Sequence, residues 1–97
     1  MITGKQRSYL KGLAHNLSPI FQLGKAGMSD NFIRQVDEAL EKRELIKINI
    51  LQNCILDPKE TAAFLAEELG AEFVQSIGSK FVIYRESKDN KKIDLPK

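Results

Sequence analysis

The feature that most constrains the fold of this chain is a regular alternation of capped helical segments with short apolar runs. Thr3, Ser29 and Asp57 each precede a segment whose apolar residues recur at helical spacing, as helix-capping residues do. Gln6 and Glu60 stand three residues after the first and third of these caps and complete the pattern of a helix start. We therefore expect three helices, over residues 3–18, 29–43 and 57–69.

Short extended segments are expected between and after these helices, over residues 20–23, 45–51, 72–77 and 80–85. Gly78-Ser79 separates the last two and is typical of a two-residue hairpin turn with glycine first. The resulting order, α-β-α-β-α-β-β, contains two β-α-β units, which call for right-handed crossovers and parallel pairing. The sequence predicts a compact two-layer α/β domain with a four-stranded mixed sheet.

The composition is that of one ordinary globular domain. A chain of 97 residues with 42% hydrophobic content can bury a core of its own. No apolar run approaches the roughly 18 residues of a membrane span, and the N-terminus lacks an apolar signal core. Cys54 is the single cysteine, and its apolar neighbours favour an inert buried thiol over a reactive one. We expect a cytoplasmic monomer with no membrane partner.

The last eleven residues differ in composition from the rest. From residue 86 onward Ser, Lys, Asp and Asn replace the apolar pattern. Such a segment lacks the apolar content needed to pack against a core. We therefore divide the chain into a folded domain, residues 1–86, and a disordered polar tail, residues 87–97.

A glycine-bracketed basic loop, Gly24-Lys25-Ala26-Gly27, joins the first expected strand to the second expected helix. Glycines let a backbone approach a ligand closely, and a helix start offers free N–H groups and a partial positive charge. Residues 1–29 contain four cations and no acid, so that they carry +4, while the other 11 cations and all 13 acids leave −2 for residues 30–97. A positive field concentrated in this way suits a polyanion.

A G-x-x-G pattern alone has two interpretations. One is an ordinary strand-to-helix turn; the other is a backbone clamp for nucleic acid, as in KH modules. The spacing fits neither a P-loop nor a dinucleotide-binding fingerprint. The lysine in the loop, the helix start after it and the acid-free surroundings favour nucleic acid.

Catalytic chemistry is poorly represented. The chain has one histidine and one cysteine, far apart in sequence, and no zinc-site spacing. We therefore expect no enzyme activity, no metal site and no cofactor.

Several separated motifs closely resemble the YhbY family, the stand-alone bacterial form of the CRM (chloroplast RNA splicing and ribosome maturation) domain. They are Thr3-Gly4-Lys5-Gln6-Arg7-Ser8-Tyr9-Leu10-Lys11, Leu13-Ala14-His15, Pro19, Gln22-Leu23-Gly24-Lys25-Ala26-Gly27, Ala39-Leu40, Glu44-Leu45-Ile46-Lys47, Ile77-Gly78-Ser79-Lys80 and Tyr84-Arg85. The resemblance covers about residues 2–86. Gly12 within the first helix and Met28-Ser29 after the loop depart from the family's pattern.

The resemblance implies an RNA-binding domain similar in architecture to the C-terminal domain of translation initiation factor three. It further implies a role with precursors of the large ribosomal subunit, or in group II intron splicing in plastids. The family's RNA-contacting GxxG loop maps onto Gly24, Lys25, Ala26 and Gly27. The family's basic positions near the start of the first helix map onto Lys5, Arg7 and Lys11.

Together the residues and the resemblance predict an RNA-binding protein that assists large-subunit ribosome assembly by binding. Lys47, Lys80 and Arg85 are further candidate RNA contacts, although exposed basic strand residues are usually only solvated. Tyr9 and Tyr84 are candidates for base stacking, with a partly buried core position as the alternative for each. The alternative function is a protein-interaction module that docks on an acidic ribosomal or assembly partner through the same basic face.

Overall fold

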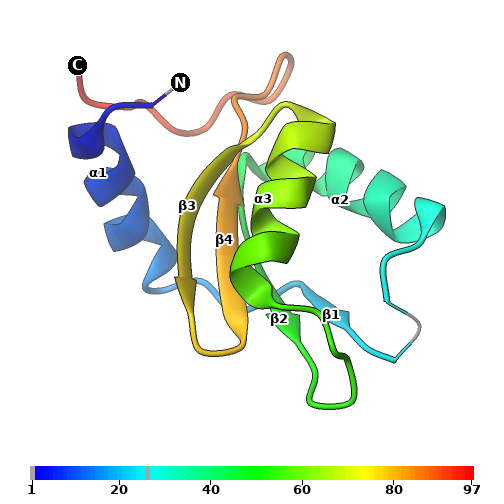
Figure 1. Cartoon of the computed structure of the whole chain (residues 1–97). Coiled ribbons are helices and arrows are strands. Elements are labelled where there is room, and N and C mark those ends of the chain that lie inside the picture. The colour runs from blue at the N-terminus through cyan, green and yellow to red at the C-terminus, as the bar shows by residue number, and fades with distance from the viewer. Residues whose placement is uncertain (1, 26) are drawn as a thin grey trace.

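The computed structural model describes residues 2–25 and 27–97. Its elements follow the expected order: α1 (Gly4–Ala14), β1 (Phe21–Leu23), α2 (Asp30–Arg43), β2 (Leu45–Ile50), α3 (Pro58–Leu69), β3 (Glu72–Ile77) and β4 (Lys80–Tyr84), as Figure 1 shows. Within the described part of the chain, no helix combines the length and apolar character needed to cross a membrane.

The helix starts form as their sequence patterns predict. The Thr3 hydroxyl accepts a hydrogen bond from the Gln6 N–H at 3.1 Å, and the Gln6 side chain accepts one from the Thr3 N–H at 3.0 Å. The carboxylate of Asp57 accepts the N–H of Glu60 at 3.0 Å in the same way at the start of α3. These bonds satisfy donors that the first helical turn leaves free.

The first helix is shorter than expected, because it ends at Ala14. The N–H of Ile20 donates to the carbonyl oxygen of Lys47 at 3.0 Å. The segment between α1 and β1 must therefore reach the edge of β2, and it leaves the helix to do so. Strand ends differ from the expected ones by at most one residue.

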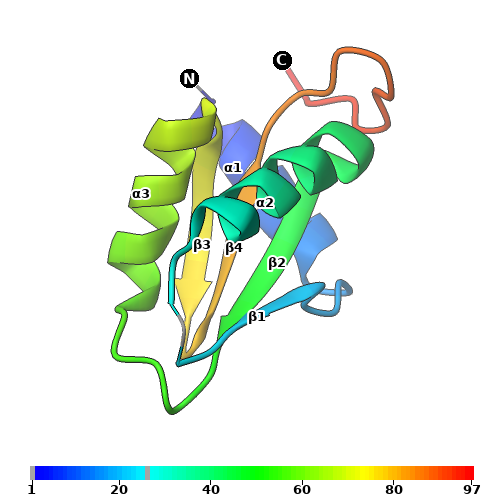
Figure 2. The same ribbon diagram turned by 90° about the vertical axis from the view of Figure 1, so that its right-hand side faces the viewer.

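The four strands form one mixed sheet in the order β1-β2-β4-β3. β1 pairs with β2 in parallel, with Phe21 opposite Ile48, while β4 is antiparallel to both β2 and β3. Parallel pairing is therefore found in the first β-α-β unit. In the second unit β4 lies between β2 and β3, so these two strands do not pair directly (Figure 2).

The sheet is apolar on both faces, and helices cover both. Phe81 and Ile83 in β4 lie in the core cluster shared with α2 and α3, whereas Val82 and Tyr84 lie in a second cluster with Leu10 of α1. Figure 1 shows α1 to the left of the sheet and α2 and α3 on the other side, and Figure 2 shows α1 behind the sheet. The domain thus has three layers where two were expected, because alternate residues of the inner strands are apolar on each side.

The C-terminal segment also differs from expectation. Residues 87–97 form no helix or strand, but Ile93 and Leu95 pack against the second core cluster. The side-chain amide of Gln6 donates to the carbonyl oxygen of Pro96 at 2.9 Å. The end of the segment that composition suggested would be disordered therefore packs beside α1.

Glu44 holds this segment in place. Its side chain is fully buried between α2 and β2, and its carboxylate accepts three backbone N–H bonds, from Ser87 at 2.7 Å, Lys92 at 2.6 Å and Ile93 at 2.8 Å. Burial raises the pKa of Glu44, but these three donations together outweigh it and leave the pKa below its ordinary value. The described residues include one non-glycine with positive φ, and it is Glu44 at 66°.

Glu41, one turn earlier in α2, binds the start of the same segment. Its carboxylate accepts the Ser87 hydroxyl at 2.6 Å and the backbone N–H groups of Lys88 at 3.3 Å and Asp89 at 3.1 Å. The pKa of Glu41 is lowered, first by the Ser87 hydroxyl and then by the N–H groups of Asp89 and Lys88. Two carboxylates, Glu41 in the last turn of α2 and Glu44 directly after it, thus supply the fixed acceptors for a segment that is poor in apolar residues.

Candidate nucleic-acid interface

The Gly24–Gly27 loop is a tight turn at the sheet edge. The N–H of Gly27 donates to the carbonyl oxygen of Gly24 at 2.9 Å, and Gly27 has a φ of +70°, which L side chains rarely adopt. A Cβ added to Gly24 would lie 3.5 Å from Leu51 Cδ1, an ordinary contact. The conformation therefore requires glycine at Gly27 only. Lys25 is exposed, and Ala26 lies outside the described residues.

A hollow of about 250 Å³ lies beside this loop, at the start of α2. It is lined by Gln22, Leu23, Gly24, Gly27, Ser29, Asn31, Phe32 and Gln35. None of these described lining residues is acidic, and the amide side chains can donate to an anion. Glycine backbone, polar side chains and a helix start meet in this hollow, which is the arrangement that suits a phosphate.

Arg34 adds a cation near this hollow that sequence reasoning missed. Its Nη2 donates at 2.7 Å to the side-chain oxygen of Asn31, one of the lining residues. The spacing of Asn31 and Arg34 on one helical face was the available signal. Lys25 in the loop and Arg34 beside the hollow are therefore both exposed cations at this site.

The cations of α1 are not brought to the loop. Lys5 and Lys11 are exposed on a helix that covers the other face of the sheet, and Figure 1 shows α1 and the β1–α2 connection on opposite sides of the molecule. Arg7 is half-buried, and its Nε donates to the carbonyl oxygen of Phe73 at 3.2 Å. Arg7 therefore also ties α1 to β3, and the acid-free N-terminal stretch does not form one continuous site.

Lys47 and Lys80 do come together. Lys47 lies opposite Val82 in the β2–β4 pairing, and Lys80 is two residues before Val82, so all three side chains share the α1 face of the sheet. They line a hollow of about 150 Å³ with Gln75 and Ile77. The α1 face thus carries its own basic surface.

Arg85 is engaged inside the protein. Its Nη1 lies 2.6 Å from Asp37 Oδ1 and 3.0 Å from the Leu69 carbonyl oxygen, and its Nη2 donates to the Asp37 carbonyl oxygen at 2.9 Å. The side chain is only 21% exposed. The structure gives this candidate RNA contact a structural role, since it joins α2 to the end of α3.

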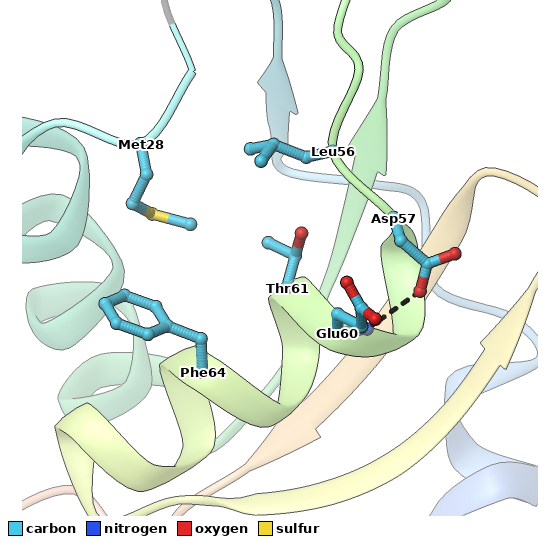
Figure 3. A pocket seen from close by; sticks show the side chains of 6 residues that line it. All are labelled: Met28, Leu56, Asp57, Glu60, Thr61 and Phe64. Carbon is cyan, nitrogen blue, oxygen red and sulfur yellow. Dashed lines mark hydrogen bonds between the residues drawn. The ribbon is translucent and has the colours of Figure 1, made fainter.

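The aromatic residues that could stack on a base also divide into exposed and buried side chains. Tyr84 is 4% exposed, and burial, followed by the nearby charges of Glu44 and Glu86, raises its pKa to about 12. Tyr9 is 43% exposed and Phe64 is 48% exposed. Figure 3 shows Phe64 facing Met28, the residue after the loop, across an apolar hollow of about 240 Å³. Tyr9 and Phe64 are therefore the aromatic side chains accessible to a base, whereas Tyr84 is a core residue.

A metal site would require a cluster of metal-ligating side chains. Among residues 2–25 and 27–97, no group of three or more His, Cys, Asp or Glu side chains could hold a metal ion.

Comparison with known proteins identifies the family. The CRS1/YhbY (CRM) domain model matches residues 2–85. The probable RNA-binding protein YqeI of Bacillus subtilis is 52% identical over 96 residues, which cover 99% of this chain and 100% of that protein. An RNA-binding protein of Haemophilus influenzae is 34% identical over 96 residues, covering 99% of this chain and 96% of that protein.

A solved structure has the same fold. The solution structure of the hypothetical protein SAV1595 from Staphylococcus aureus superposes with a TM-score of 0.82 at 58% sequence identity, covering 99% of this chain and 100% of that one. The resemblance seen in the separated sequence motifs is thereby confirmed. The chain belongs to the CRS1/YhbY (CRM) domain family.

Proposed function

We propose that this chain binds RNA of precursor large ribosomal subunits and assists their assembly as a monomer in the cytoplasm. The observation that carries the proposal is the polar hollow beside the Gly24–Gly27 loop, whose described lining has no acid, in a chain whose relatives are named RNA-binding proteins. The proposed action is binding, in line with the names of the relatives.

The loop holds a phosphate of the RNA backbone. Gly27 closes the turn, Lys25 supplies a full positive charge, and the start of α2 supplies its partial charge. Gln22 and Gln35 line the hollow and can donate to phosphate or sugar oxygens. Contacts of this kind position an RNA without reading its sequence.

A second set of contacts lies on the α1 face, where Lys5, Lys11, Lys47 and Lys80 bind neighbouring parts of the RNA. The domain measures 39 × 26 × 22 Å, and the two surfaces lie on different sides of it. An RNA that contacts both must pass around the protein. This requirement favours a folded RNA, such as ribosomal RNA, over a short straight duplex.

Crosslinking to RNA in cells, followed by sequencing of the attached fragments, tests the proposal. We expect fragments of large-subunit ribosomal RNA, enriched from particles that sediment as precursors. The same gradient run after nuclease digestion separates the rival function. If the protein still sediments with ribosomal particles once their RNA is digested, it docks on a protein partner and the proposal is wrong.

A further inference from the structure

A second basic hollow lies on the α1 face, away from the loop. It has a volume of about 390 Å³ and lies between the segment that follows α1 and the start of β2. Three cations line it: Arg43 in the last turn of α2, Lys47 in β2 and Lys92 in the C-terminal segment. None of the described lining residues is acidic, and Asn16 and Ser18 add polar groups. Two parts of the chain that are distant in the sequence, residues 43–47 and Lys92, thus bring positive charge to one place.

The position of Lys92 is set by the buried carboxylate of Glu44. The backbone N–H of Lys92 donates to Glu44 Oε1 at 2.6 Å, and the next N–H, of Ile93, donates to the same oxygen at 2.8 Å. Ile93 also packs on the second core cluster. Lys92 is therefore held at a fixed backbone position beside the hollow, whereas a lysine on a free tail would lose more entropy on binding.

The negative charge of Glu44 does not cancel this cluster by direct pairing. Its side chain is fully buried and its oxygens are occupied by three backbone N–H groups. The ion pairs found among the described residues, Arg85 with Asp37 and Lys91 with Glu86, include none of these three cations. These cations lie near an anchored backbone with no acid lining the space between them.

We propose that Arg43, Lys47 and Lys92 bind the phosphodiester backbone of the RNA in this hollow, and that Glu44 is a positioning residue for Lys92. The proposal rests on the proposed RNA-binding function and extends its interface to the C-terminal segment. Lys47 lines both this hollow and the one that contains Lys80, so the two sites lie next to each other on the α1 face. Each phosphate neutralised there releases counterions and adds to the salt dependence of binding.

The test compares two charge-reversal pairs in the full-length chain. Arg43→Glu with Lys92→Glu changes the hollow, and Lys42→Glu with Lys88→Glu makes the same change of charge at exposed neighbouring positions outside it. The probe is large-subunit ribosomal RNA transcribed in vitro, and circular dichroism checks that each variant is folded. We expect the first pair to weaken binding at least about tenfold and the control pair less than about threefold, because only the first faces a bound phosphate.

The salt dependence of RNA binding gives a second test of the phosphate contacts in this hollow. Arg43→Ala with Lys92→Ala should make the slope of log affinity against log salt shallower by about 1.4 to 1.8, at about 0.7 to 0.9 per phosphate. The site would be wrong if the two charge-reversal pairs bound RNA equally well and the alanine pair kept the salt slope of the parent. If the parent itself binds well, the proposed function would still stand. A parent that does not bind this RNA would overturn both.

Glu44 is tested by a double-mutant cycle with Lys92. Glu44→Gln places an amide N–H₂ group among backbone N–H donors and so loosens the segment. If Glu44 acts through Lys92, Lys92→Ala weakens RNA binding in the parent and has little further effect in the folded Glu44→Gln variant. Equal effects of Lys92→Ala in both backgrounds would show that Glu44 has only a structural role. Amide NMR spectra of the Glu44→Gln variant verify that the rest of the fold persists.

Discussion

The guanidinium of Arg85 lies 2.6 Å from the carboxylate of Asp37, and it also bonds the last carbonyl of α3, that of Leu69, at 3.0 Å. Arg85 directly follows β4, so this one side chain connects an inner strand of the sheet to both α2 and α3. A basic residue at a strand end that resembled an RNA contact in the sequence is thus used for packing.

Replacing Arg85 by methionine should therefore affect folding and leave binding unchanged. We expect a loss of about 1 to 2 kcal/mol of unfolding free energy in urea, because charge-assisted hydrogen bonds are lost at a mostly buried site and Asp37 remains partly hydrated. RNA affinity should stay within about twofold of the parent. Lys59→Met, at an exposed position of α3, is the control with no stability loss. If the variant were as stable as the parent but bound RNA weakly, Arg85 would be an RNA contact after all.

A charge reversal at Lys25 tests whether the Gly24–Gly27 loop binds RNA. Lys25→Asp removes one positive charge and adds one negative charge beside the hollow at the start of α2. We expect an unchanged circular dichroism spectrum and RNA affinity reduced at least about tenfold, equivalent to about 1.4 kcal/mol. Lys59→Asp makes the same change near the start of α3 and should bind RNA almost normally. Normal binding by both variants would make the loop an ordinary turn.

The two glycines of the loop should differ in their tolerance to alanine. Gly27→Ala places a side chain at a φ of +70° and should cost about 1 kcal/mol or more of stability, since L residues are strained there. Gly24→Ala adds a methyl group at an ordinary contact distance from Leu51 and should cost little. Thermal unfolding of the two variants checks this order. A reversal would mean that the loop changes conformation in solution.

Removal of residues 87–97 should destabilise the domain, although composition alone suggests no effect. Truncation withdraws three N–H donors from buried Glu44 and uncovers the cluster that Ile93 and Leu95 cover. Because a buried carboxylate then loses its partners, we expect a cost on the order of 3 kcal/mol in urea unfolding. Removal of Lys97 alone is the control and should leave the midpoint in place. An unchanged midpoint for the longer truncation would show that the segment is detached in solution.

The same contacts predict a dependence on pH. The pKa of Glu44 and that of Glu41 are both lower in the folded protein than their ordinary value of 4.5. Lowered carboxyl pKa values contribute stability that is fully present above the unfolded pKa and is lost as pH falls through the folded pKa. We expect the thermal midpoint of the parent to fall steeply below about pH 4.5. The fall should be shallower in Glu44→Gln, which has one fewer such group.

Local patterns predicted the helices and strands well because their causes are local. Thr3 with Gln6 and Asp57 with Glu60 satisfy helix starts within one turn, and Gly78 marks the hairpin. The side of the sheet covered by α1 was not predicted, since it depends on which face the second set of apolar strand residues occupies. Leu45 of β2 lies with Val82 and Tyr84 of β4 in the cluster that α1 covers.

The C-terminal segment was missed for a different physical reason. Its anchors are backbone N–H groups, which every sequence except proline offers, and their acceptor Glu44 is 48 residues from Lys92. Nothing in the composition of residues 87–97 signals such a contact. The same distance in the sequence hides the candidate site, since Arg43 and Lys92 line one hollow only after the segment has folded back onto Glu41 and Glu44.

The place of β4 in the sheet also determines when during synthesis the fold can be completed. β4 is the last strand in the sequence, yet it lies between β2 and β3 and supplies Val82 and Tyr84 to the cluster under α1. While the chain is being synthesised, β3 has no strand to pair with and α1 has an incomplete surface to cover until residue 84 has emerged. A nascent chain therefore cannot present the proposed α1-face surface before β4 has emerged, and a fragment ending before β4 would present only a loop on an unfinished sheet.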